Sequence, residues 1–428
     1  MKFHDWVEIP YEDGAEPELA DRYGSGPWDA LEREHGRLPL TRLYTAVPED
    51  RLRELIEEAT RRDDSYRPPN FFTWFTVETP EGVRSEELAT MLLAWEVVEK
   101  AYPDSQPEDP FPVDPTDDPR RADQGYLDPA PGGINAEFAW SVPGGDGVGQ
   151  RFVDLEQGWT LNHEDLGGHG ASLLHGTMTQ TSLAHGTAVL GVICALDNTW
   201  GCIGITPNIA SVNVASHSGS SSNISDAVLA AVSDLGPGHV LLIEVQLAVS
   251  GGTIELIDDV YESLRLATAL GIVVVEAAGN GAKNLENVTN IGGGRNVLSP
   301  GGRGFRDSGA IIVGAARSAV PHARLGFSNF GRRVDCYGWG ENVDTTSSDN
   351  AGLTFLYTSI FSGTSAASPI VAGAALAVQG FVEAQLGHRL SPAEIRDRLR
   401  DPATGTPSAS NADRIGVMPD LSAIIPAL

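Results

Sequence analysis

Four residues of the chain carry side chains that together can hydrolyse an amide bond: Asp154, His185, Asn280 and Ser365. A serine hydroxyl is a weak nucleophile near neutral pH, so an imidazole has to accept its proton. A buried carboxylate orients that imidazole, and a side-chain amide can donate a hydrogen bond to the oxyanion that forms. This set of residue types therefore predicts acyl transfer from a serine nucleophile.

Each of these residues is expected at the end of a helix or strand. Asp154 closes the apolar run QRFVDL, and Asn280 follows the run VVVEAAG. His185 and Ser365 begin segments of small residues with a helical pattern, and a helix N-terminus offers backbone N–H groups to an oxyanion. Taken singly, each residue has a structural explanation as a cap, a turn or a helix start. Their joint occurrence in this order favours catalysis.

To bring these four residues together, the fold needs a sheet whose strands end at one edge. The sequence pattern in the second half of the chain predicts such a sheet. The runs predicted as buried strands are 150–155, 210–216, 240–248, 271–279 and 309–316, and the predicted helices include 225–235 and 257–271. Continuous apolar strands alternating with helices are typical of a parallel sheet covered on both faces. The expected fold class is therefore α/β, with the site outside the carboxyl ends of the strands.

Four segments give the candidate residues a recognisable context. They are HGTAVLG (185–191), VVVEAAGN (273–280), SGTSAASPIVAG (362–373) and FVDLEQGWTLNHEDL, which contains Asp154. In this order and with these flanks they resemble the motifs of the subtilase family of serine peptidases, over residues 123–385. The resemblance implies a subtilisin-like parallel sheet with helices on both faces and the activity of a serine endopeptidase.

The resemblance also implies a role for each candidate residue. Asp154 would orient the imidazole, His185 would act as the base, Ser365 would attack the carbonyl carbon, and Asn280 would stabilise the oxyanion. This chemistry requires no redox or organic cofactor. The alternative is a subtilase-fold protein that no longer cleaves and serves as a binding or regulatory module.

Two stretches depart from the family pattern. Leu155 and Glu156 stand where the family has Ser/Thr-Gly after its catalytic aspartate. The run VQLAVSGG matches the family's substrate-binding strand poorly, and its Ser250, Gly251 and Gly252 are the candidate substrate-binding residues. The family often binds structural calcium, but the acidic clusters match no assignable calcium loop, so the metal ligands stay unassigned.

The first part of the chain has a different pattern of predicted elements. Residues 1–39 show no clear periodicity and are predicted to be an extension, whereas residues 40–102 follow the order β-α-β-α-β, which indicates a small ferredoxin-like α+β unit. The Pro- and Asp-rich stretch 103–122 is predicted to link this unit to a peptidase domain at 123–428. The resemblance implies a prodomain that assists folding and blocks the cleft of a zymogen. The alternative is a permanently attached accessory domain.

Composition limits the expected partners. The chain has 428 residues and a net charge of −29, which repels nucleic-acid phosphates and anionic membranes. We therefore expect protein or peptide substrates, and neither a nucleic acid nor a membrane as a partner. The N-terminus lacks the apolar core of a signal peptide, so we expect a cytoplasmic location, or secretion by a route without such a peptide. Three cysteines are too few for a disulfide scaffold.

Overall fold

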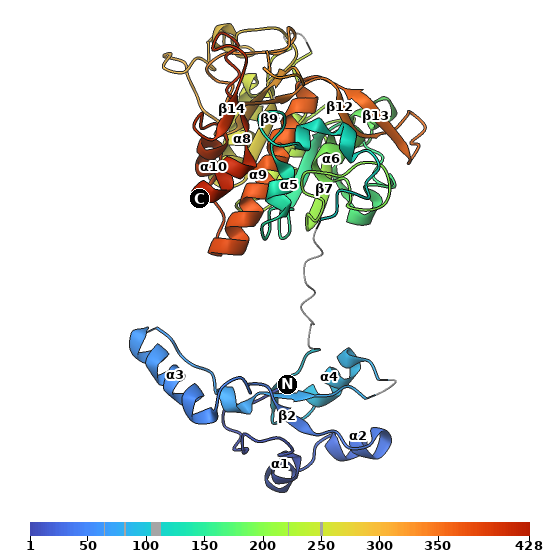
Figure 1. Cartoon of the computed structure of the whole chain (residues 1–428), viewed down its shortest axis with the longest axis vertical. Helices are drawn as coiled ribbons and strands as arrows, with labels where there is room; N and C mark the ends of the chain where they lie inside the picture. Colours follow the sequence, from blue (N-terminus) through green and yellow to red (C-terminus); the bar gives the residue numbers. More distant parts are fainter. Residues whose placement is uncertain (64, 81–82, 104–112, 221, 249–250) are drawn as a thin grey trace. The chain divides into compact units, whose positions relative to one another are not determined.

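The computed structural model describes residues 1–428 except 64, 81–82, 104–112, 221 and 249–250 (Figure 1). The chain divides into two compact units, Met1–Pro110 and Phe111–Leu428, called here the N-terminal unit and the C-terminal unit. Each unit has its own cluster of buried hydrophobic side chains. Each is therefore a domain with its own core.

The N-terminal unit consists of short strands and helices. In chain order these are β1 (Lys2–Phe3), α1 (Glu16–Tyr23), α2 (Trp28–His35), β2 (Leu40–Arg42), α3 (Glu49–Arg62), β3 (Phe75–Val77), α4 (Ser85–Leu93) and β4 (Val98–Lys100). The described strands form two antiparallel pairs, β1 with β4 and β2 with β3, and an antiparallel bridge between Lys2 and Trp74 connects the two pairs. From residue 40 onward the elements have the predicted order β-α-β-α-β.

The first 39 residues are part of this unit and not an extension of it. Strand β1 pairs with β4, and residues from this stretch form a large share of the core: Phe3, Val7, Leu19, Trp28, Leu31 and Leu38. The sequence shows no periodicity here because α1 and α2 have only 8 residues each, which is too short for a repeat to emerge. The predicted boundary at residue 40 therefore cuts through the unit.

The C-terminal unit is organised around a nine-stranded sheet. In spatial order its strands are β14 (Gly405–Pro407), β15 (Val417–Pro419), β11 (Cys336–Trp339), β10 (Ile311–Ala316), β9 (Val273–Ala277), β8 (Val240–Ile243), β5 (Arg151–Glu156), β7 (Ser211–Ser216) and β6 (Ser172–His175). All neighbouring strands run parallel except β14 and β15. The α/β fold class with a parallel sheet is confirmed.

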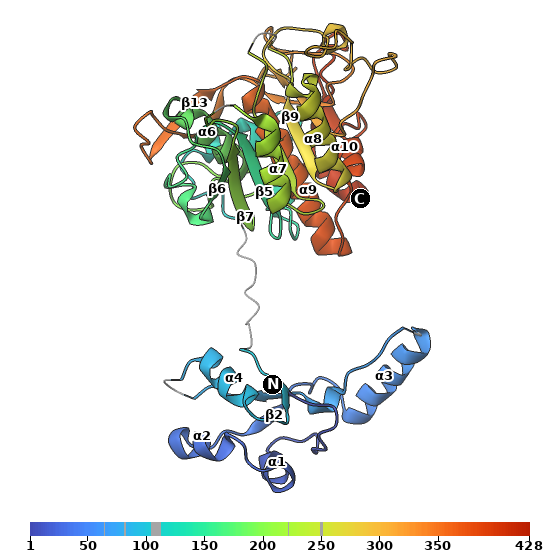
Figure 2. The ribbon, with the colours of Figure 1, turned by 180° about the vertical axis from the view of Figure 1, so that it is seen from behind.

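Helices cover both faces of this sheet. One face packs against α6 (Leu183–Cys194) and α9 (Thr364–Leu386), and the other packs against α7 (Ile224–Asp234) and α8 (Asp258–Ala269), which Figure 2 shows in front of the strands. The remaining elements are α5 (Ala136–Trp140), α10 (Pro392–Leu399), α11 (Leu421–Ile424) and the antiparallel pair β12 (Val343–Ser347) and β13 (Leu356–Phe361). The two helical layers exclude water from both sides of the central strands.

Side chains along β5 alternate between these two layers, as the pleat of a strand requires. Phe152 lies in the core cluster that includes the side chains of α6 and α9, whereas Val153 and Leu155 lie in the cluster that includes those of α7 and α8. Asp154 and Glu156 follow Phe152 by two and four residues, so all three side chains lie on the same face of β5. Both acidic side chains of this strand therefore point toward α6 and α9.

Helix α9 passes through the centre of the larger core. It has 23 residues with a hydropathy of 1.5 in its most apolar window, and 89% of that window is buried inside the protein. By length and composition, no other helix among the described residues is suited to cross a membrane. The burial of α9 between the sheet and α6 accounts for its apolar composition.

The predicted linker, 103–122, is only partly a connection. Residues 104–112 lie outside the described residues. From Val113 the chain packs on the C-terminal unit: the backbone N–H of Arg120 donates to the carbonyl of Gly201 over 2.7 Å, and its guanidinium pairs with the buried carboxylate of Asp344. The described end of this stretch is therefore part of the C-terminal unit.

Candidate active site

Three of the four candidate catalytic residues come from elements of the C-terminal unit that meet at the carboxyl edge of its sheet. His185 lies in the first turn of α6, Ser365 is the second residue of α9, and Asn280 follows β9. These three residues, with Glu244, Val245, Gln246, Ala277 and Thr364, line one cavity of about 170 Å³. Parallel strands all present their carboxyl ends on this edge, so the fold brings together residues that are distant in the sequence.

The imidazole of His185 is held by a carboxylate. Its Nδ1 lies 2.7 Å from Oε2 of Glu156, the last residue of β5. The Glu156 side chain is 4% exposed, whereas that of His185 is 39% exposed. The ring of Phe361 packs edge-on against the imidazole at 5.6 Å. The carboxylate is thus buried behind the ring, and the opposite edge of the imidazole is available to the cavity.

The predicted partner of His185 was Asp154, and the structure places Glu156 there instead. Asp154 lies two residues earlier on the same face of β5, and its Oδ2 accepts a hydrogen bond from Nε1 of Trp159 over 2.7 Å. Two residues span about 6.6 Å along a strand, so the two carboxyl groups lie at different depths below the sheet edge. Strand β5 continues to Glu156, which puts that residue at the edge where α6 begins.

One signal in the sequence marks Glu156. Gly158 follows it by two residues, as the glycine follows the catalytic aspartate in the family pattern Asp-Ser/Thr-Gly. A Cβ on Gly158 would lie 2.5 Å from the carbonyl oxygen of Thr179, so the turn has no room for a side chain. Gln157 and Gly158 therefore complete the motif around a glutamate, and Glu156 rather than Asp154 occupies the position of the aspartate in the family pattern.

The side chain of Asn280 is oriented by the start of α9. Its Oδ1 accepts hydrogen bonds from the backbone N–H and the hydroxyl of Thr364, over 2.9 and 3.1 Å. With the oxygen engaged, the amide nitrogen remains as a donor. This nitrogen would lie 3.6 Å from a Cβ on Gly363, two residues before Ser365. Asn280 thus presents an N–H donor beside the serine that begins α9, as an oxyanion requires.

A third buried carboxyl group, Glu244, lies at this site. It directly follows β8, and its Oε1 accepts a hydrogen bond from the hydroxyl of Ser368 over 2.5 Å. Burial raises the pKa of Glu244 well above its ordinary value, and the same cause acts on Asp154 and Glu156. The sequence analysis did not single out Glu244, although an acidic residue inside the apolar run VLLIEVQLA is itself a signal of a special environment.

A wider cavity of about 540 Å³ adjoins the first and shares His185 and Glu244 with it. Residues Val245, Gln246, Leu247 and Ala248 line one side of it. An extended peptide can pair with such a segment through backbone hydrogen bonds.

The candidate substrate-binding residues lie beyond this segment. Ser250 falls outside the described residues. The N–H of Gly251 donates to the carbonyl of Leu247 over 2.6 Å, and neither Gly251 nor Gly252 is among the residues that line the two cavities. A Cβ on Gly251 would lie 2.7 Å from Cα of Gly281, so this turn packs against the loop of Asn280. Its glycines allow that close approach.

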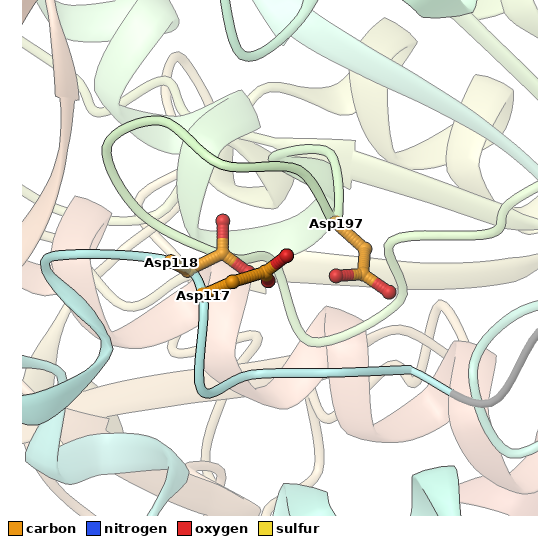
Figure 3. A group of neighbouring side chains, drawn as sticks. All are labelled: Asp117, Asp118 and Asp197. Carbon is orange, nitrogen blue, oxygen red and sulfur yellow. The ribbon is translucent and has the colours of Figure 1, made fainter.

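Another group of acidic side chains, Asp117, Asp118 and Asp197, is suited to hold a cation. Each offers a carboxylate oxygen, and these oxygens lie within 4.8 Å of one another (Figure 3). Asp118 is 3% exposed, and neither of its oxygens accepts a hydrogen bond of normal geometry from the described residues. Burial raises the pKa of Asp118 to about 8, which the backbone N–H of Asn198 only partly offsets. Hard cations such as Ca²⁺ prefer oxygen ligands of this kind.

Comparisons with known proteins agree with the geometry. The sequence model described as "Subtilase family" matches residues 163–417. Subtilisin DY of Bacillus licheniformis is 30% identical over 260 residues, which are 60% of this chain and 85% of that protein. Subtilisin Savinase of Lederbergia lenta is 31% identical over 268 residues, which are 62% of this chain and 87% of that protein.

Solved structures show the same fold. A protease structure from Pseudoalteromonas arctica superposes with a TM-score of 0.55 at 21% identity, covering 73% of this chain and 99% of that chain. This likeness confirms the predicted subtilisin-like sheet with helices on both faces.

Proposed function

This chain belongs to the subtilase family, and on that premise we propose that it cleaves peptide bonds with a triad of Ser365, His185 and Glu156. It is a subtilisin-like serine peptidase, and its substrates are proteins or peptides. The observation that carries the proposed triad is the hydrogen bond between His185 Nδ1 and Glu156 Oε2, beside a cavity that Ser365 also lines. Asn280 supplies the oxyanion donor.

The reaction follows from this geometry. Glu156 accepts the Nδ1–H of His185, which leaves Nε2 with a lone pair to take the proton of Ser365 as its Oγ attacks the substrate carbonyl. The amide of Asn280 and the N-terminus of α9 donate to the oxyanion that develops. His185 then gives the proton to the leaving amine, and an acyl-enzyme forms on Ser365. A water molecule then attacks the acyl-enzyme while His185 accepts its proton. His185 returns this proton to Ser365 Oγ, and the carboxylic acid product leaves.

The N-terminal unit is proposed to be a prodomain. Support comes from its separate core and from the order β-α-β-α-β of its residues 40–102, which is the order expected of such a unit. In this role it assists folding and blocks the cleft until it is removed. The measurement is the intact mass of the purified protein over time. Cleavage near residues 103–122 that depends on Ser365 supports a zymogen, and a stable full-length chain that remains active supports an accessory domain.

A structural calcium ion is proposed for Asp117, Asp118 and Asp197. Support comes from the burial of Asp118, whose oxygens accept no hydrogen bond of normal geometry within the described residues. A bound divalent cation supplies the positive charge that three converging carboxylates otherwise lack. The chemistry at Ser365 uses no metal in this proposal. Neither a nucleic acid nor a membrane is proposed as a partner.

The decisive experiment is labelling with a fluorophosphonate probe, followed by intact mass. A single adduct that disappears in Ser365→Ala demonstrates an activated serine at this position. Ser233→Ala is the matched control, because Ser233 is an exposed helical serine on α7 and lies on the other face of the sheet. Absence of an adduct from both the intact chain and any shortened form contradicts the proposal and supports a silent binding or regulatory module.

A further inference from the structure

The two acidic residues of β5 form one buried unit. Asp154 is fully buried and Glu156 is 3% exposed, and both point toward α6 and α9. They are two residues apart on the same face of β5, so their carboxyl groups are neighbours inside the protein. Each has one further partner: Asp154 Oδ2 accepts from Trp159 Nε1, and Glu156 Oε2 contacts His185 Nδ1, both over 2.7 Å. One buried oxygen on each residue, Oδ1 of Asp154 and Oε1 of Glu156, has no hydrogen-bond donor among the described residues.

These two oxygens can pair with each other only if one carboxyl group keeps its proton, because two ionised carboxylates have no proton to donate. Like charges this close also repel strongly in a buried site, so one of the two groups has to be neutral. No lysine or arginine among the described residues forms an ion pair with either carboxyl group. The titratable side chains that act on the pair are His185 and Cys194 of α6 and Glu244 after β8.

The environment decides which of the two groups holds the proton. Glu156 contacts the imidazole that becomes positively charged during the reaction, and this favours its ionised form. Asp154 has only the neutral N–H of Trp159, and burial together with the charge of Glu156 raises the pKa of Asp154. Burial raises the pKa of Glu156 as well, but a hydrogen bond donated by Asp154 opposes that rise.

We propose that Asp154 is a positioning residue that keeps its proton and donates it in a hydrogen bond to Glu156, extending the arrangement to Ser365, His185, Glu156 and Asp154. This rests on the proposed function. Glutamate has one more side-chain torsion than aspartate, so a glutamate behind the imidazole has more rotameric freedom to lose. The hydrogen bond from Asp154 fixes the carboxylate plane that His185 requires. The Asp154 proton does not move during turnover; only the Ser365 proton is transferred.

The test compares two substitutions at one position, in the active form obtained from the full chain. In Asp154→Asn the amide N–H₂ can replace the acid proton and the amide oxygen can still accept from Trp159, so we expect kcat to fall by no more than about threefold. In Asp154→Ala the donor is lost. We expect kcat to fall roughly 10- to 100-fold, because the usual free energy of a hydrogen bond to a charged group corresponds to a rate factor of this size. KM is expected to change little in either variant.

The pH profile separates this role from two others. Without a donor, Glu156 becomes more basic and stabilises the imidazolium more, so the acid limb of kcat/KM moves to higher pH in Asp154→Ala. In Asp154→Asn the limb stays in place. If Asp154 were ionised, Asn would remove a negative charge beside His185, and the limb would move to lower pH with a large loss of kcat; this result overturns the proposal. Full kcat in the Ala variant, with only thermal stability reduced, overturns it as well.

A spectroscopic measurement tests the proton directly. In the inactive Ser365→Ala background at neutral pH, the infrared difference between Asp154 and Asp154→Asn should contain one carboxylic-acid C=O band. Only carboxylate bands in that difference overturn the proposal. The proposed function is tested apart from this by Glu156→Gln. If Glu156→Gln is inactive and Asp154→Asn is equally inactive, the triad stands and the proton assignment fails; if Glu156→Gln retains full kcat, the triad itself fails.

Discussion

Two of the groups of buried acidic side chains in the C-terminal unit are neutralised by different means. Beside His185, Asp154, Glu156 and Glu244 form no ion pair with any described lysine or arginine of this unit. Beside Arg333, which is 1% exposed, Asp335 pairs with the guanidinium over 2.8 Å, and Arg396 pairs with the same carboxylate over 2.8 Å.

The difference follows from what each place has to do. A permanent guanidinium neutralises a carboxylate at all times, which suits a structural cluster. A triad carboxylate has to stabilise a positive charge that exists only while His185 holds the serine proton. A fixed cation beside Glu156 would oppose that transient charge. The site therefore relies on protonation and on neutral donors such as Trp159 and Ser368.

The largest expected effect concerns the acidic group beside His185. Glu156→Gln removes the negative charge behind His185 and leaves the fold nearly intact, so kcat should fall by about 10³- to 10⁴-fold. The measurement is kcat for a peptide substrate, with thermal unfolding to show that the protein is folded. Glu262→Gln, on the exposed side of α8, is the control and should have the wild-type kcat. A loss smaller than tenfold would contradict the role of Glu156.

The next effect belongs to the structural cluster. Arg333→Met leaves the buried Glu255 without its cation and removes one of the cations paired with Asp335, so the free energy of unfolding should fall by about 3–5 kcal/mol. Denaturant unfolding of the full chain measures this, and kcat per folded molecule should remain near that of the wild type. Arg303→Met is the control, because Arg303 is exposed. If Arg333→Met abolished turnover in fully folded protein, the two clusters would not be functionally separate.

A third effect concerns the proposed calcium ligands. Asp118 has its pKa raised to about 8 by burial, so without calcium its contribution to stability is full below its ordinary pKa of 3.8 and is lost as the pH rises toward 8. A cation bound to the ionised carboxylate reverses this loss. At a concentration a hundredfold above its Kd, calcium should add about 2.7 kcal/mol at pH 8.

The measurement is the thermal midpoint at pH 5 and pH 8, with chelator and with calcium. Asp118→Asn should abolish both the decline with pH and the effect of calcium, and Glu262→Gln, on the exposed side of α8, should preserve them. A calcium effect that persists unchanged in Asp118→Asn would place the ion elsewhere.

The smallest expected effect tests whether Glu244 takes part in the chemistry. Ser368→Ala removes the donor to Glu244 Oε1, so stability should fall by about 1–3 kcal/mol, which is the usual cost of an unsatisfied buried group. We expect kcat to change less than threefold, because Ser365 and His185 keep their partners. A tenfold loss of kcat in folded protein would give Glu244 a place in the reaction.

Much of this site could be predicted from sequence because its motifs are local. His185, Asn280 and Ser365 each stand at the end of an apolar or small-residue segment, and the structure places all three on one cavity. The contact of Asp154 was predicted wrongly, because side chains at positions 154 and 156 face the same way and the strand end was placed too early. The fold of residues 1–39 was missed because its elements are short and pair with strands far along the chain.

The sequence by itself determined the alternation of buried strands and helices, and with it the edge at which a nucleophile, a base and an amide gather. Only the tertiary structure decided which of two neighbouring carboxyl groups meets the imidazole. The pleat directs both Asp154 and Glu156 toward α6, and their different distances from the start of that helix select Glu156. Packing likewise decided that Asp118 meets Asp197, since a buried carboxyl group acquires its neighbours from elements that the local pattern cannot relate.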